Sequence, residues 1–379
     1  MAKKHSALEV LVLSSGLLLG VFLGSVPVSA QRAPSANYES DKKVKLSGIV
    51  NRIDWVNPSA FVTVNVKDST GIISNWAVEV GNPLDLQKDG WKATSVHIGD
   101  MVTVEGIPAR GPRRQALATS VVLARTGAKV FVVSNKKAAK VASQPVPRWP
   151  DGHPRLGPPP GKKGYWGPPS STVLVENTGV AIPMNRDGLL ANILDADKVA
   201  PFQPWAKAVY EYRQRTLFKD DPYNRCIPPG GARHFQSPYG FQFIEQPTIG
   251  RILLLLGGGD RNWRIIYTDG RPIGHKDELV QTYYGASTGH WEGDTLVVDT
   301  VGFNEKFWFT NGGLPHTEAL HLTERFTRSD LNTLKYQVTV DDPQTYTRTW
   351  TGGWNIQWVP DEEIQEYFCE ENAESTFIR

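Results

Sequence analysis

Residues 44–131 alternate short runs of β-branched residues with turn signals. The runs are typical of strands, and Asn57-Pro58 and Gly99-Asp100 are among the turns that separate them. Residues 84–88 predict a short helix between the third and fourth strands. Five strands with a helix in that place predict a small OB-like barrel, with strands at residues 44–50, 61–66, 76–80, 101–105 and 116–123.

A longer series of strand patterns lies in residues 171–379. A helix is predicted first, at about 204–219, because Pro204 suits a first helical turn and Asp220-Asp221-Pro222 ends it. Alternating segments follow, with hairpin signals such as Glu292-Gly293-Asp294 between them. We expect an antiparallel, lipocalin-like barrel or curled sheet with the helix as its cover. Its strands are expected at 239–246, 251–256, 262–267, 283–291, 295–303, 319–327, 334–340, 346–358 and 363–369.

Residues 132–170, between these two series, contain nine prolines and seven basic residues against one acid, Asp151. Such a composition favours extended, polyproline-like conformations. We interpret the segment as a stiff spacer between two domains. The alternative is a basic strap that binds anionic envelope polymers or lipid head groups.

Alternation in the second series places charged residues on apolar faces. Arg348 shares a face with Trp350 and Trp354, and Glu324 shares one with Leu322. An unpaired buried charge is unfavourable by several kcal/mol, so such residues pair, shift their pKa or contact a ligand. The charged residues expected inside the barrel are Glu245, Asp299, Glu324 and Arg348.

Three interpretations of these residues are open. Glu324 and Arg348 could form a structural ion pair against tryptophans. Arg348 could instead bind a ligand carboxylate or phosphate, with Trp350, Trp354, Glu245 and His316 as further ligand contacts. In a catalytic version, Asp299 and Glu324 act as acid and base together with His290.

Residues 303–318 form a long glycine- and aromatic-containing segment that we expect to cover one mouth of the barrel. His316, Glu318 and His321 follow closely and are chemically suitable as weak metal-ligand candidates. Their spacing matches no specific zinc motif, and His321 has the parity of the outer face. We therefore expect hydrogen-bonded histidines, no metal and no cofactor.

Composition excludes several classes of protein. The 379 residues include 41 Lys+Arg and 39 Asp+Glu, so a basic footprint for nucleic acid is missing, and we expect no nucleic-acid partner. A hydrophobic content of 40% is enough for sizeable cores. The length suits two domains.

The first thirty residues indicate export. Lys3 and Lys4 precede a short apolar stretch, and Val28-Ser29-Ala30 provides small residues before a cleavage point. We expect a signal peptide cleaved after Ala30 and a periplasmic or secreted protein. The later aliphatic run within residues 251–257 has only five residues, so we do not expect an integral membrane protein.

Export also changes the interpretation of the two cysteines, Cys226 and Cys369. In an oxidising compartment we expect them to form a disulfide, which would close a loop of about 140 residues and contribute roughly 5 kcal/mol. Two separately buried thiols are the alternative.

Two stretches resemble known families. Residues 48–58, with Trp76-Ala77-Val78-Glu79 and residues 99–106, resemble an OB-like domain of unknown function found in exported bacterial proteins. Asn57-Pro58-Ser59 departs from that family's usual Asn-Pro-His. Residues 289–299 resemble a stretch of uncharacterised exported bacterial proteins. The resemblance implies an OB-like fold and export, and it implies no chemistry.

The leading functional hypothesis is a binding protein that holds a small amphipathic or anionic ligand in the second barrel, with Arg348 as its anchor. The enzyme alternative is a hydrolase or isomerase that uses Asp299, Glu324 and His290. The third hypothesis is an envelope interaction scaffold with a filled interior.

Overall fold

The structure is a computed structural model that describes residues 38–39, 41–55, 60–81, 83–109, 113–132, 144–167, 169, 174–184, 188–236, 240–258, 263–274, 279–364 and 366. The predicted signal peptide and Cys369 lie outside these residues, so export, cleavage after Ala30 and the disulfide stay predictions. None of the helices in the described segments is both long and apolar enough to cross a bilayer.

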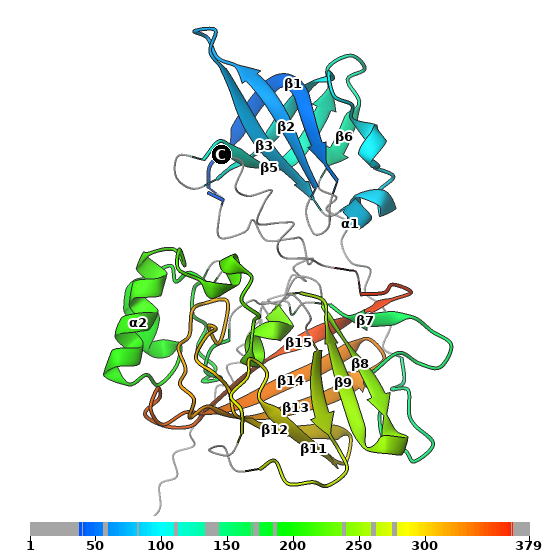
Figure 1. Ribbon diagram of the computed structural model, residues 1–379, viewed down its shortest axis with the longest axis vertical. Coiled ribbons are helices and arrows are strands. Elements are labelled where there is room, and N and C mark those ends of the chain that lie inside the picture. Colours follow the sequence, from blue (N-terminus) through cyan, green and yellow to red (C-terminus); the bar gives the residue numbers. More distant parts are fainter. Residues whose placement is uncertain are drawn as a thin grey trace, which may run out of the picture.

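The fold is mainly β, as predicted, and it contains two closed barrels (Figure 1). In the first barrel β1 pairs with β2 and β4, β2 pairs with β3, and β4 pairs with β5. A short parallel pairing between β3 and β5 closes the ring, and β6 extends it from β5. Its elements are β1 (Val44–Asp54), β2 (Ala60–Lys67), β3 (Ile73–Gly81), α1 (Pro83–Lys88), η1 (Ala93–Ser95), β4 (Met101–Pro108), β5 (Gln115–Leu123) and β6 (Lys129–Val132).

Alternation explains this first barrel. In β1, Leu46, Gly48 and Val50 point inward, and Val50 packs in a valine-rich core. Gly48 is required by close approach, because a Cβ there would lie 2.1 Å from the carbonyl oxygen of Asn65. Helix α1 lies between β3 and β4, where the sequence predicts it.

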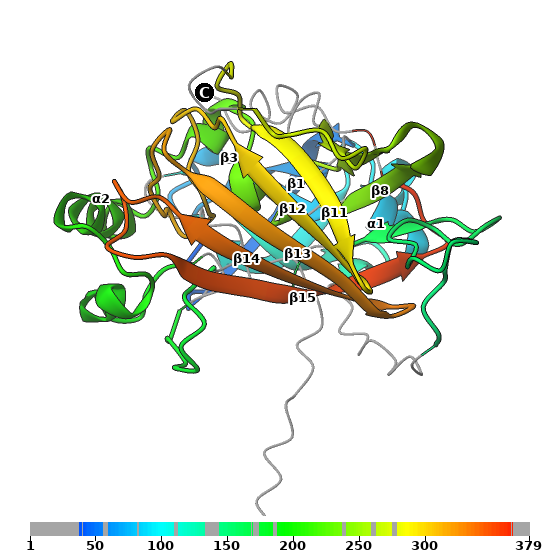
Figure 2. The same ribbon diagram turned by 90° about the horizontal axis from the view of Figure 1, so that it is seen from below.

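The second barrel has nine strands, closed in the order β7 to β15 and back to β7. Figure 2 shows β11 to β15 side by side along its wall. The prediction of a purely antiparallel barrel is wrong at one seam, where β10 and β11 run parallel over two residue pairs. The strands are β7 (Gly164–Trp166), β8 (Phe241–Gln246), β9 (Arg251–Leu256), β10 (Trp263–Tyr267), β11 (Ala286–Glu292), β12 (Thr295–Val301), β13 (His321–Asp330), β14 (Thr333–Asp341) and β15 (Trp350–Pro360).

The predicted spacer is only partly a spacer. Strand β7 comes from it and closes the barrel, since Trp166 pairs with Trp358 on one side and Phe241 on the other. Leu156 and Trp166 are fully buried. These apolar residues among the prolines give residues 144–166 surface to bury, so this part belongs to the second barrel. Residues 133–143 lie outside the described residues.

Helix α2 (Pro204–Arg215) lies beside the second barrel in both views (Figures 1 and 2). It is shorter than predicted, because Leu217 and Phe218 adopt left-handed backbone angles just after it. The 3-10 helices of this part are η2 (Ile193–Lys198), η3 (Pro222–Arg225), η4 (Gly231–Gln236) and η5 (Pro247–Ile249).

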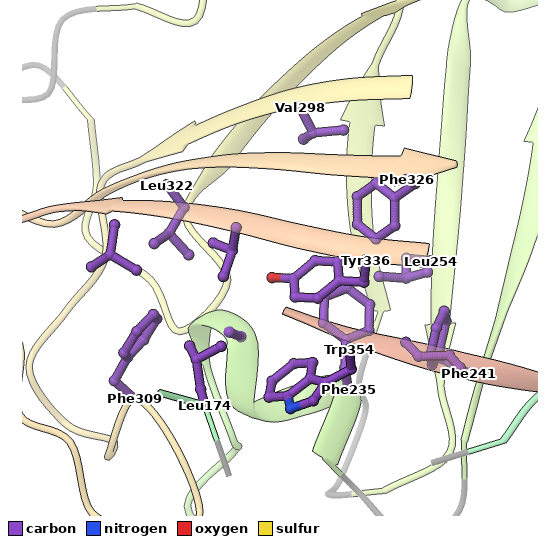
Figure 3. Packing of buried hydrophobic residues seen from close by; sticks show 14 of the residues in the cluster. Leu174, Phe235, Phe241, Leu254, Val298, Phe309, Leu322, Phe326, Tyr336 and Trp354 are labelled. Atoms are coloured by element: carbon purple, nitrogen blue, oxygen red, sulfur yellow. The ribbon is translucent and has the colours of Figure 1, made fainter. Parts of the chain in front are cut away.

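The interior of the second barrel is filled by η4, all six residues of which are buried. The Phe235 ring lies 4.8 Å from Phe241 and 4.7 Å from Tyr336 between ring centroids, and Tyr336 stacks on Trp354 at 5.4 Å (Figure 3). Residues 303–318 add further aromatic side chains to the same core at one end of the strands. Aromatic packing of this kind leaves the centre of the barrel to protein side chains.

Candidate functional site

A buried polar network crosses the wall of the second barrel. Arg264 on β10 is 3% exposed and Glu324 on β13 is 0% exposed. The guanidinium makes a bidentate contact with the carboxylate, with Nη1 donating to Oε1 at 3.2 Å and Nη2 donating to Oε2. Such a pair is strong because both partners are charged and their geometry is complementary.

Three further strands complete the network. Arg264 Nε donates to Ser287 Oγ on β11 at 2.9 Å, and Nη2 donates to Thr300 Oγ1 on β12 at 2.6 Å. Tyr336 on β14 donates its hydroxyl hydrogen to Glu324 Oε1 at 3.0 Å. Burial and the nearby Glu324 charge raise the pKa of Tyr336 well above its usual value, so the phenol stays a neutral donor.

The network lies at the seam between β10 and β11. The parallel seam between β10 and β11 is paired over only two residues, and Arg264 bridges it to Ser287 and Thr300. The side chains therefore reinforce a seam where backbone pairing is short.

His234 of η4 lies inside the same barrel and is buried. Burial, with the positive charge of Arg264, holds the pKa of this imidazole well below its usual range. The ring is therefore neutral at pH 7.

Glu324 lies inside the barrel as predicted, but the prediction that Arg348 is its partner is wrong. Arg348 is exposed and pairs with Glu176, with Nη2 3.0 Å from Oε2. Strand β15 begins only at Trp350, so strand alternation does not extend back to Arg348. Trp350 and Trp354 do point inward.

The prediction that Asp299 points inward is also wrong. The inward residues of β12 are Leu296, Val298 and Thr300, so Asp299 lies on the outer side. It contacts His321 Nε2 at 3.1 Å and accepts a hydrogen bond from Thr323 Oγ1 at 2.8 Å. The sequence misleads here because Val297 on the outer side is nevertheless buried, so both faces of β12 look apolar.

The expected catalytic trio is consequently not assembled. His290 is exposed on β11, 3.3 Å from Glu292 Oε1, whereas Glu324 is sealed inside the wall and Asp299 lies outside it. Acid–base chemistry needs its groups within hydrogen-bond reach of one substrate, and this arrangement does not provide that.

Glu245 points inward at the end of β8, as predicted. Its carboxylate accepts hydrogen bonds from Trp149 Nε1 at 3.0 Å and from the backbone amides of Leu156 and Gly157 at 3.0 and 2.8 Å. Burial raises its pKa despite these donors. The neighbouring recess, which Trp149, Glu245 and Trp291 help to line, has a volume of about 40 Å³. Glu245 therefore fastens residues 149–157 to the barrel, beside a space of water-molecule size.

The metal-ligand candidates His316, Glu318 and His321 have separate surroundings. His316 is buried, with Nε2 3.1 Å from the Phe307 carbonyl oxygen, and burial lowers its pKa. Glu318 is exposed, and His321 contacts Asp299 instead. Within the described segments, no group of three or more His, Cys, Asp or Glu residues could hold a metal ion.

Sequence patterns did not identify the buried arginines Arg233, Arg264 and Arg328. Arg233 of η4 makes a bidentate contact with Asp221. Arg264 was missed because its neighbours Trp263, Ile265 and Tyr267 suggest that the opposite face of β10 points inward. Arg328 follows the inward parity of β13 two residues beyond Phe326, so extending that strand would have revealed it.

Arg328 has a structural role. Nη1 donates to the carbonyl oxygens of Arg155 and Gly157 at 2.7 and 2.8 Å. Its Cζ lies 4.8 Å from the ring centroids of both Trp166 and Trp358. Burial lowers its pKa to about 10. This arginine therefore fastens the segment before β7 to the barrel.

The chain is thus a mainly β, two-barrel protein whose inward Arg264 and Glu324 are paired with each other. A model for a family of unknown function, DUF6152, matches residues 21–118, which end within β5. The match fits an uncharacterised protein with this N-terminal domain. No curated protein matches the chain.

Proposed function

We propose that the protein is an exported envelope interaction scaffold that acts through its outer surfaces. The proposal takes residues 1–30 as a signal peptide and the first barrel as OB-like. The barrel order β1-β2-β3-β5-β4, with α1 between β3 and β4, supports the second assumption.

The filled interior of the second barrel carries the proposal. Ligand-binding barrels hold their ligand in a cavity of several hundred Å³ lined by apolar and a few polar groups. Here Phe235, Tyr336 and Trp354 occupy the centre, and the inward Arg264–Glu324 charges are already paired. Neither the ligand-binding nor the hydrolase hypothesis has comparable support.

A cavity probe tests this proposal. Benzene stabilises proteins that have room for it, because it binds the folded state alone. We expect saturating benzene to leave the Tm of the full-length exported protein unchanged. Phe235→Ala, which opens a space beside Tyr336, should gain a rise in Tm with benzene.

The milder Leu254→Ala serves the same purpose if Phe235→Ala does not fold. A benzene-dependent rise in the wild-type Tm that Phe235→Trp abolishes would show room in the interior, and the scaffold proposal would then fail.

A further inference from the structure

Apolar side chains gather on the outer side of β9 and β10 and at Ile244 of β8, between the outward Gln242 and Gln246. Cross-strand pairing aligns Ile244 with Leu253 and Leu253 with Ile265, and it places Leu255 opposite Trp263. Since alternate residues of a strand share a face, these five side chains form one continuous surface. We name these five residues the apolar wall.

The apolar wall is accessible in the described structure. Ile244 is 40% exposed and Trp263 is 53% exposed, and Ile249 in the adjoining turn is 56% exposed. The other three residues are half-buried. Continuous exposed apolar patches on soluble domains mark sites of protein or membrane interaction.

The composition of β9 also indicates that its outer face is covered by a partner. Its last five residues are aliphatic, and Ile252, Leu254 and Leu256 fill the core while Leu253 and Leu255 face outward. A strand with an apolar residue at every position is typical of a sheet covered on both sides.

Basic side chains border the apolar wall. Pairing places Arg251 between Gln246 and Tyr267 in the next row, and its Nε donates to Gln246 Oε1 at 2.6 Å. The Arg271 guanidinium lies 3.8 Å from the Tyr267 ring centroid. Asp269 is neutralised by Arg271, so the net charge contributed by these three ionised side chains is positive.

The apolar wall and its basic border together favour a lipid surface as the partner. Trp at a membrane surface lies at the head-group level, with aliphatic side chains reaching toward the acyl chains. Arginine binds lipid phosphate, and a basic border favours anionic head groups. An apolar protein partner would match the five side chains but would not require the basic border.

We propose that the apolar wall docks on the surface of an anionic lipid bilayer. Trp263 and Ile244 enter the boundary between head groups and acyl chains, and Arg251 contacts phosphate. The inference rests on the proposed function, because it names the surface partner of the scaffold.

Vesicle flotation with the full-length exported protein tests the inference. One probe is vesicles of phosphatidylcholine in which about 30% of the lipid is anionic phosphatidylglycerol. The other probe is vesicles of phosphatidylcholine alone. We expect the wild type to float with the anionic vesicles and to bind neutral vesicles about tenfold more weakly. Arg251→Gln should weaken binding to anionic vesicles about fivefold.

Substitutions within the wall give the larger effect. Ile244→Ser with Trp263→Ser should reduce flotation by about tenfold or more, because both inserting side chains are lost. The matched control is Leu194→Ser, at a residue that is 80% exposed in η2, outside the wall. This control should float like the wild type.

Several outcomes would overturn the inference. They are a wild type that stays with the soluble fraction, equal binding to both vesicle types, or an equal loss in the Leu194→Ser control. A wild-type dimer that the double substitution converts to a monomer in light scattering would identify a second copy as the occupant. If the double variant does not fold, Arg251→Gln alone decides the test. The benzene experiment is independent, so failure of the lipid inference is distinguishable from failure of the scaffold proposal.

Discussion

Strands β8–β10 and strands β11–β13 belong to one barrel and differ in what they show to the outside. The first group exposes aliphatic and aromatic side chains, whereas the second exposes charged and polar ones, among them Glu292, Thr323 and Arg325. On the inner side the two groups are alike, since Leu254 and Leu322 both lie in the core. Core formation therefore explains the inner faces, and the outer face of β8–β10 needs a different explanation.

The comparison also shows how the buried charge is shared. Arg264 enters from the apolar group, and Glu324 enters from the polar one, across the weak β10–β11 seam. The pair holds together two stretches of wall whose outer surfaces differ in polarity.

Loss of one partner of the buried pair should have the largest effect. Arg264→Met leaves Glu324 buried without its cation, and we expect the free energy of unfolding to fall by about 3–5 kcal/mol. Urea denaturation measures it. Arg348→Met, which removes an exposed partner of Glu176, is the control and should leave the urea midpoint nearly unchanged. Similar losses in the two variants would mean that the Arg264–Glu324 contact is not buried as described.

Substitutions at two adjacent leucines of β9 should lower the free energy of unfolding by different amounts. Leu254 is fully buried and Leu253 lies on the apolar wall. We expect Leu254→Ala to lower the free energy of unfolding by about 2–5 kcal/mol, because it leaves a cavity, and Leu253→Ala by clearly less. The same denaturation experiment compares them. A larger loss for Leu253→Ala would reverse the assigned faces of the strand.

Stability should fall as the pH is lowered from 7.5 to 5.5. Burial holds the pKa of His234 and of His316 below the ordinary 6.5, so the unfolded chain binds protons more readily than the folded one. Each imidazole should reduce the free energy of unfolding by up to about 1.4 kcal/mol per pH unit below that value. Burial raises the pKa of Glu245 above its ordinary 4.5, so this carboxyl acts in the opposite direction, from that value upward.

The check is urea denaturation at several pH values. His234→Gln should show a shallower decline than the wild type between pH 7.5 and 5.5. An unchanged slope would mean that His234 does not titrate as a buried neutral imidazole.

Changes on the apolar wall should have the smallest effect on stability. Trp263→Ser removes a half-exposed side chain from the outer face, and we expect a change within about 0.5 kcal/mol in the absence of lipid. Thermal unfolding of the purified protein measures it. A drop of several kcal/mol would mean that Trp263 supports the barrel itself and does not belong to a free surface.

Sequence patterns predicted what depends on short-range alternation. The five-stranded barrel with its helix, the inward Glu324 and Glu245, and the inward Trp350 and Trp354 follow from periodicity within single strands. Alternation identifies an inner face only where the other face is polar, as it is around Glu324 on β13.

The remainder depends on long-range packing. Asp299 was assigned to the wrong face and Arg264 was not identified, because β10 and β12 carry apolar residues on both sides. Closure by β7 and filling by η4 join segments far apart in sequence, and no local pattern determines such contacts. Arg348 was misplaced by a strand boundary two residues away, the least certain part of any pattern-based assignment.

Hydroxyl-radical footprinting of the full-length exported protein tests the central claim most directly. It measures whether the interior of the second barrel is closed to solvent and whether the apolar wall is exposed. The account predicts strong labelling of Trp263 and Ile244, with Tyr336 and Trp354 protected until the protein unfolds. Labelling of Tyr336 and Trp354 in the native protein, at the level of Trp263, would reveal an accessible interior and contradict the account.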